Sequence, residues 1–437
     1  MKRKIFLILA LIFLPRLAYA EFPEKVTIRD RTIESRTVEE IRKLGFECED
    51  VPWRDNAARV YIDAMNLYKD CSPELRDALA AAAKTLDFGE HAEEARRFLE
   101  DNRQVLDLLK QADGMPKYEF PMHKPERVVG TQMLGLVDFQ RFGILLASEA
   151  VYDFSTGKSK DALDESFLAL RLGKRVSTGH FLITWLVGVA VESVGWKSLD
   201  RMTASGKLDE PTLKDIGRRL DESAGLGDLT RAFRHERIWT MKFLEDMEKL
   251  PPEQRAETFE RMGVKGVKSE DIQWDVARKN MTEAFDFYDT RAKKSVLEAL
   301  RGENSIEAFK KTRAKEWDTM TRTFMPGLDK LFVTSGRGQV VFEALRIRVA
   351  LERFKLAKGA YPRDLAGLVP QYLDKLPTDP FSGRPYGYRL EVDGNFLLWS
   401  VGEDLKDDGG KGEASNPWTG PDYVFTSRRE GPQEPPK

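Results

Sequence analysis

The last part of the chain constrains the fold most, because its apolar residues change from a helical to an extended period over a short distance. From Gly338 onward, apolar residues recur every three or four positions, as Val341, Leu345 and Val349 do, with charged residues between them. This spacing predicts an amphipathic helix. Gly359 favours the left-handed conformation in which many helices end, so the helix is predicted to end there.

Alternating apolar residues follow, and they predict β-strands. The alternating positions are Tyr386, Tyr388 and Leu390, then Phe396, Leu398 and Ser400. Asp393-Gly394 stands between the two runs, and this dipeptide is a strong signal for a hairpin turn. A last run from Tyr423 to Phe425 predicts a third strand. Residues 336–428 are therefore predicted to form a small α+β domain of one helix plus a three-stranded antiparallel sheet.

The order and wording of these features resemble the globular domain of the major pseudopilin of type II secretion. The resemblance rests on the Tyr361-Pro362 turn, on LPTDPFSGRPYGY at 376–388 and on SVGEDLKDDGG at 400–410, and it covers about a fifth of the chain. In that family a loop of similar wording binds calcium beside the last strand. The resemblance therefore implies a pseudopilin-like fold and a calcium site, with Asp404 as the aspartate of the Ser-x-Gly-x-Asp wording.

Two departures from the family limit what the resemblance implies. Pseudopilins begin with a long uncharged apolar helix, whereas Arg346 and Arg348 interrupt the apolar run here. Charged residues at these positions keep the helix out of a bilayer or a pilus core. The domain also lies at the end of a long chain. The fold is expected to carry over, and pilus assembly is not.

The acidic loop is the candidate metal site. Three carboxylates fall within five positions, and Gly409-Gly410 allows a tight turn after them. Hard cations bind such clustered oxygens together with backbone carbonyls. The predicted calcium ligands are Asp404, Asp407, Asp408, Ser400 and Asp422. An EF-hand is excluded because Lys406 and Ser415 stand at ligand positions, and a solvated acidic turn is the alternative.

The N-terminus has the pattern of an export signal. Basic residues at 2–4 precede an apolar stretch, and Ala18-Tyr19-Ala20 is a typical cleavage site, so residues 1–20 are predicted to be a signal peptide. The protein is therefore expected in the periplasm or cell envelope, with no membrane-spanning segment after cleavage. In that compartment Cys48 and Cys71 either pair as a disulfide or remain thiols.

The rest of the chain is predicted to be mainly α. After an N-terminal segment at 21–51, residues 52–250 carry helical spacing and are predicted to form a large helical domain. Its apolar stretches 133–151 and 181–196 are interrupted by charges and are predicted to be its buried centre. Residues 157–176 resemble half of a tetratricopeptide-type helix pair, without a second copy at a fixed period. A charged helical arm and linker at 251–335 and a disordered tail at 429–437 complete the organisation.

Composition and motifs limit the classes of function that the sequence allows. The chain has 70 basic and 72 acidic residues, a balance that argues against a nucleic-acid partner. Its four histidines are scattered, and the sequence has no zinc, phosphate-loop or nucleophile motif. We therefore expect an exported, non-enzymatic interaction scaffold that binds a protein partner. The alternative is a periplasmic enzyme with a carboxylate-based site in the helical domain, where Glu149 and Glu192 lie in apolar helices.

Overall fold

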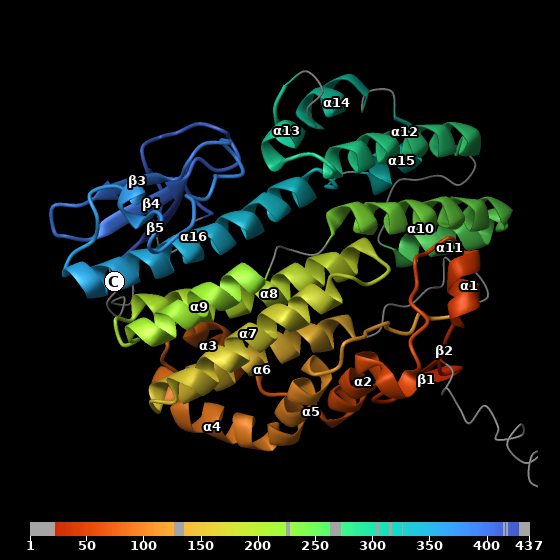
Figure 1. Ribbon diagram of the computed structural model, residues 1–437. Helices are drawn as coiled ribbons and strands as arrows, with labels where there is room; N and C mark the ends of the chain where they lie inside the picture. Colours follow the sequence, from red (N-terminus) through yellow and green to blue (C-terminus); the bar gives the residue numbers. More distant parts are fainter. Residues whose placement is uncertain are drawn as a thin grey trace, which may run out of the picture. The chain divides into compact units, whose positions relative to one another are not determined.

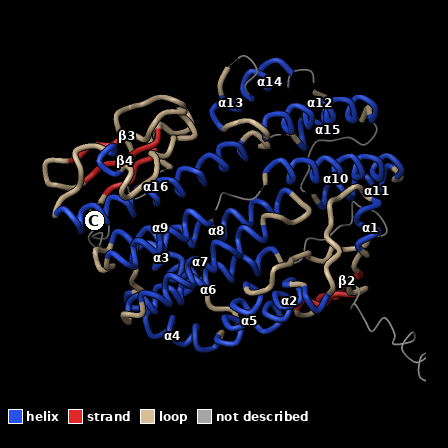
Figure 2. Tube along the Cα trace, viewed as in Figure 1, coloured by secondary structure: helices blue, strands red, loops and turns tan. Residues whose placement is uncertain are grey.

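A computed structural model describes residues 22–125, 135–223, 228–262, 272–302, 306–313, 317–325, 327–413, 416 and 418–427. The predicted signal peptide at 1–20 and the tail at 429–437 lie outside the described residues. The chain is mainly helical and has a small three-stranded antiparallel sheet near its C-terminus, which confirms the predicted fold class (Figures 1 and 2). It divides into two compact units, one within Met1–Lys69 and Asp101–Leu136 and the other within Asp70–Glu100 and Val137–Lys437.

The first unit combines a β-hairpin with a helix pair. Strands β1 (Lys25–Ile28) and β2 (Arg31–Glu34) are antiparallel, and a capping box of Thr37 and Glu40 begins α1 (Val38–Lys43). Helices α2 (Ala57–Leu67) and α5 (Arg103–Asp113) pack together. The hairpin was not predicted, because each of its strands has only four residues and buries at most two of them.

Buried Asn102 explains why residues 92–113 form two helices and not one. The amide of Asn102 accepts a hydrogen bond from the backbone N–H of Lys69 and donates one to the carbonyl of Lys69, at 2.9 and 3.0 Å. Its own backbone leaves the helical conformation. The segment therefore forms two helices, α4 (Ala92–Asp101) and α5, instead of one.

The centre of the second unit is a closely packed antiparallel helix pair, α7 (Ser159–Val176) and α8 (Leu182–Ala204). Gly173 and Gly188 allow the close approach: a Cβ on either would lie 2.5 Å from the carbonyl oxygen of the other. Around this pair lie α3 (Pro73–Thr85), α6 (Leu136–Ser155) and α9 (Glu210–Glu222). The two apolar stretches of the sequence correspond to α6 and α8, and both helices are largely buried, as predicted.

By length and composition alone, α8 is apolar enough to cross a membrane, a property that buried core helices share. In this structure 56% of the apolar stretch of 18 residues within α8 is buried inside the protein.

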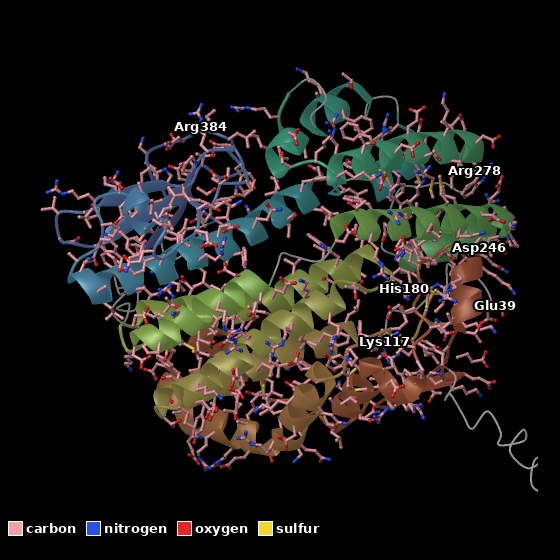
Figure 3. The ribbon with its side chains drawn as sticks, in the orientation of Figure 1. Glu39, Lys117, His180, Asp246, Arg278 and Arg384 are labelled. Carbon is pink, nitrogen blue, oxygen red and sulfur yellow. The ribbon has the colours of Figure 1, made fainter. Side chains whose placement is uncertain are left out.

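Helix α10 (Leu229–Lys249) precedes the charged segment that begins after residue 250. The described helices of that segment are α11 (Pro252–Arg261), α12 (Trp274–Ala292), α13 (Val296–Leu300), α14 (Ile306–Arg313) and α15 (Thr319–Phe324). Although the segment is highly charged, α12 packs on α10 and buries Phe285 and Tyr288. Arg278, labelled in Figure 3, joins α12 to Glu248 of α10 at 2.6 Å.

Helix α16 (Lys330–Lys358) connects the helices to the sheet. It begins eight residues before the predicted start, so Ser335-Gly336 lies inside it and is not a linker. Gly336 serves close packing there, because a Cβ at this position would lie 2.5 Å from the ring of Phe381. The helix ends at Gly359, which has a φ of 82°, as predicted.

The C-terminal sheet has the predicted order. Strands β3 (Gly387–Leu390), β4 (Phe396–Ser400) and β5 (Tyr423–Thr426) are antiparallel, with β4 in the middle. One face of α16 packs against this sheet through Val340, Ile347 and Leu351. The opposite face contributes Leu345 and Val349 to a core shared with α7, α8 and α9. The helix therefore lies between the sheet and the helical layer (Figure 1).

Arginines on α16 fix it to this layer. Arg346 donates to Asp221 and Arg353 to Glu210, both on α9, at 2.6 and 2.9 Å. Arg348 donates to Asp200 of α8 at 2.6 Å. Arg346 and Arg348, which interrupt the apolar run of the sequence, thus bind α16 to its neighbours.

Candidate functional site

The predicted metal ligands lie in and beside one loop. Two of them, Ser400 and Asp422, are already hydrogen-bonded to other groups of the protein. Ser400, at the end of β4, donates from its hydroxyl to the carboxylate of buried Asp379 at 2.7 Å. The carboxylate of Asp422 accepts hydrogen bonds from the backbone N–H groups of Asp408, Gly410 and Lys411, at 3.3, 2.8 and 3.0 Å. Burial raises the pKa of Asp422, and these three N–H groups oppose that rise. Asp422 thus closes the loop through the protein's own backbone.

The other three carboxylates do not converge: Asp404 and Asp407 are exposed, and Asp408 is half-buried. Asp404 accepts from the N–H of Lys406 at 3.0 Å, and Asp407 accepts from the indole N–H of Trp399 at 3.0 Å. Among the described residues, no three carboxylates of this loop come within 4.8 Å of one another. In this conformation they do not form a closed coordination shell for calcium. Calcium binding therefore remains a prediction, and it requires the loop to rearrange.

The two glutamates of the alternative hypothesis are both buried, at 3% exposure each. Glu149 lies on α6, and Glu192 lies on α8. Glu192 lines a cavity between α7, α8 and α9, whereas Glu149 does not line it. The structure therefore supplies one carboxylate of the proposed acid–base pair at a cavity, but not both.

A cavity of about 410 Å³ lies between α8, α16 and β5 in the second unit. One face of α8 provides Ser193, Trp196 and Lys197, and one face of α16 provides Arg337 and Val341. The rest of the wall comes from other residues of α8 and α16, from α3, from β5 and from the segment before β5. Its members are Lys84, Val189, Asp200, Arg201, Thr334, Gly338, Arg348, Asn416, Trp418, Val424, Phe425 and Thr426.

Two arginines of the wall hold the cavity together. Arg348 is 3% exposed, and besides Asp200 it donates to the carbonyl oxygen of Thr426 in β5 at 3.0 Å. Arg337 donates to the hydroxyl of Tyr423 at 3.0 Å and lies over the ring of Trp418, 5.4 Å from its centroid. These bonds connect α8 and α16 to the sheet, so the walls of the cavity are linked to one another.

The two lysines of the cavity wall, Lys84 and Lys197, lie in a region of net positive charge. The wall carries five basic residues and one acidic residue, Asp200, which is already paired with Arg348. Desolvation and the positive charge of Lys84 both lower the pKa of Lys197. Within the described part of the chain, neither Lys84 nor Lys197 has an ion-pair partner. A positive potential thus lies beside the aromatic surfaces of Trp196, Trp418 and Phe425.

Sequence reasoning missed this cavity. The local signal is a polar stripe at Ser193, Lys197 and Asp200, at helical spacing in a mostly apolar helix. The other walls come from segments far apart in the chain, which no local pattern brings together.

No known protein family matches the chain, and no curated protein or solved structure shows significant similarity to it. The pseudopilin resemblance thus rests on its own residues.

Proposed function

We propose that the protein is an exported, non-enzymatic scaffold that binds an acidic segment of a partner protein in the cavity between α8, α16 and β5. The observation that carries the proposal is the pair of lysines, Lys84 and Lys197, without an ion-pair partner among the described residues, beside aromatic side chains. Such a surface complements carboxylates that flank an aromatic or aliphatic residue.

The form of the cavity supports a binding role. Its frame is held by buried hydrogen bonds of Arg348 and by Arg337, so it is preformed, which lowers the entropy cost of binding. The single carboxylate in its wall, Asp200, is bound to Arg348. General acid–base catalysis needs a titratable group within reach of a substrate, and a carboxylate held in an ion pair is poorly suited to that role.

Export is the second part of the proposal, and it is supported by the signal-peptide pattern at 1–20. Mass spectrometry of the protein isolated from its native cell should find Glu21 at the mature N-terminus. An intact Met1 on the mature protein would contradict export.

The cavity is tested with a defined peptide. Fluorescence anisotropy of rhodamine-labelled DEFDE should show binding to the full chain, with KKFKK as the reversed-charge control. Lys84→Glu together with Lys197→Glu should weaken binding by about tenfold or more, since two attractive charge pairs become repulsive. Binding should also fall as salt rises.

The matched control reverses two exposed lysines outside the cavity, Lys214 on α9 and Lys358 on α16. This variant has the same change in net charge, so it should bind DEFDE like the wild type. Equal weakening in both double variants would show that only net charge matters, and the cavity would not be the site.

A further inference from the structure

One face of α8 places the amine of Lys197 at the cavity between α8, α16 and β5. Lys197 follows Val189 and Ser193 at steps of four along the helix, and all three residues line the cavity. The side chain of Lys197 is exposed, so a small molecule in the cavity can reach it. The one carboxylate of the wall, Asp200, is bound to Arg348 at 2.6 Å. Lys197 therefore has a positive charge beside a cavity whose carboxylate is already in use.

A second lysine shares this cavity. Lys84 of α3 also lines it, and α3 packs on α8. Over the ranges that the structure describes, neither lysine has an ion-pair partner. Two ammonium groups at one cavity repel each other, and loss of a proton from either of them removes that repulsion.

The positions of the two lysines in their helices decide which of them gives up its proton. Lys84 lies in the last turn of α3, where the helix dipole favours a positive charge. Lys197 lies inside α8, away from both ends, and gains nothing comparable. Desolvation, together with the charge of Lys84, lowers the pKa of Lys197, in agreement with these positions. Lys197 is thus the lysine of the pair that more readily becomes a neutral amine.

A neutral lysine amine is a nucleophile, and a neighbouring cation is one of the known ways to produce it in a protein. Its nitrogen attacks the carbonyl carbon of an aldehyde. The two N–H hydrogens leave with the carbonyl oxygen as water, and a C=N bond remains. The neutral imine replaces an ammonium group, so its formation also removes the repulsion from Lys84.

The rest of the wall selects the aldehyde. Trp196, Trp418 and Phe425 supply aromatic surface, and Lys84 keeps its positive charge. We propose that Lys197 is a modification site, whose amine forms an imine with an aldehyde that carries an anionic group on an apolar body. The anionic group pairs with Lys84, and the apolar body lies against the aromatic side chains.

The test reagent is p-formylbenzoate, which has an aldehyde and a carboxylate on one aromatic ring. The full chain is incubated with it at pH 7.5 in the presence of sodium cyanoborohydride, whose hydride reduces the imine to a stable secondary amine. Peptide mass spectrometry then follows each lysine. Lys197 should be labelled about tenfold faster or more than Lys214 of α9 and Lys358 of α16, two exposed lysines outside the cavity.

Variants of Lys84 test the effect of the neighbouring charge. Lys84→Met should slow the labelling of Lys197 about threefold or more, toward the rate of Lys214. Lys84→Arg keeps the charge and should keep the fast labelling of Lys197. Lys214→Met is the matched control, because it removes one positive charge outside the cavity, and it should leave the labelling of Lys197 unchanged.

The uncharged methyl ester of p-formylbenzoate tests the choice of aldehyde. With the ester, the ratio of labelling at Lys197 to labelling at Lys214 should fall about threefold or more, since the pairing with Lys84 is lost. An unchanged ratio would overturn the proposal as stated. Equal labelling of Lys197, Lys214 and Lys358, or equal effects of Lys84→Met and Lys214→Met, would overturn the modification site itself.

This inference does not depend on the proposed function. Labelling of Lys197 needs no peptide, so a failure of DEFDE to bind would overturn the proposed function and leave the modification site in place. Binding of DEFDE without preferential labelling of Lys197 would do the reverse.

Discussion

Arg348 interrupts the apolar pattern of its helix, and the structure shows what this single residue does there. The sequence marks it as a charge that breaks an apolar helix, and this indicates that the helix does not enter a bilayer. Its partner could not be predicted, because Asp200 lies 148 positions earlier in the chain. The structure buries the guanidinium between Asp200 and the carbonyl of Thr426, with the ring of Phe396 5.4 Å away.

Loss of this side chain should be costly. Arg348→Ala removes the ion-pair partner of Asp200 and one hydrogen-bond donor to the carbonyl of Thr426. We expect a loss of about 3 kcal/mol in the free energy of unfolding, the low end for a buried pair, because the Asp200 side chain is 25% exposed. Arg346→Ala removes a more exposed pair with Asp221 and should cost about 1 kcal/mol or less. Urea unfolding followed by circular dichroism measures both.

A second variant separates the ion pair from simple loss of packing. Arg348→Ala combined with Asp200→Ala no longer leaves the partly buried carboxylate of Asp200 unpaired, so it should recover part of the stability. Losses that simply add would show that Asp200 and Arg348 are not coupled.

At the scale of an element, the acidic loop shows what spacing can and cannot predict. The sequence correctly places the hairpin, the third strand and the helix end at Gly359, because each depends on local period or turn chemistry. The sequence also predicts that the proposed calcium ligands lie in one region of the chain. It did not predict that Asp422 would point inward to three backbone N–H groups, because this depends on how left-handed Gly409 and Gly410 orient the backbone.

Calcium titration tests the loop. The full chain should bind calcium with a dissociation constant of about 10⁻³ M, at the weak end of extracellular sites, because Asp404 and Asp407 must give up hydrogen bonds from Lys406 and Trp399. Asp404→Ala should abolish binding, and Asp374→Ala, an exposed acidic change in the same module, should not. Calorimetry that shows no wild-type binding at 10-fold higher calcium, about 10⁻² M, would leave a plain acidic turn that Asp422 closes.

At the scale of the whole molecule, the chain passes between its two units more than once. Residues 70–100 belong with 137–437, although 22–69 and 101–136 surround them in sequence. The sequence predicted the helices of this region but grouped them as one domain, since helical period shows which face of a helix is buried and not against which neighbour. The evidence for the observed grouping is that α3 packs on α8, and α2 packs on α5.

Hydrogen exchange should therefore distinguish helices that are neighbours in the sequence but belong to different units. Leu106 on α5 and Leu199 on α8 are both fully buried, one in each unit, so truncating either to alanine should cost about 2–5 kcal/mol. Leu106→Ala should speed exchange in α2 and α5 and leave α3 protected, because α3 unfolds with the other unit. Leu199→Ala should speed exchange in α3, α7 and α8 and leave α2 protected. Mass spectrometry of peptides from 57–67, 73–85, 103–113 and 182–204 gives the result directly. If α3 follows α2 in both variants, the chain unfolds in sequence blocks and the two units are not its cooperative parts.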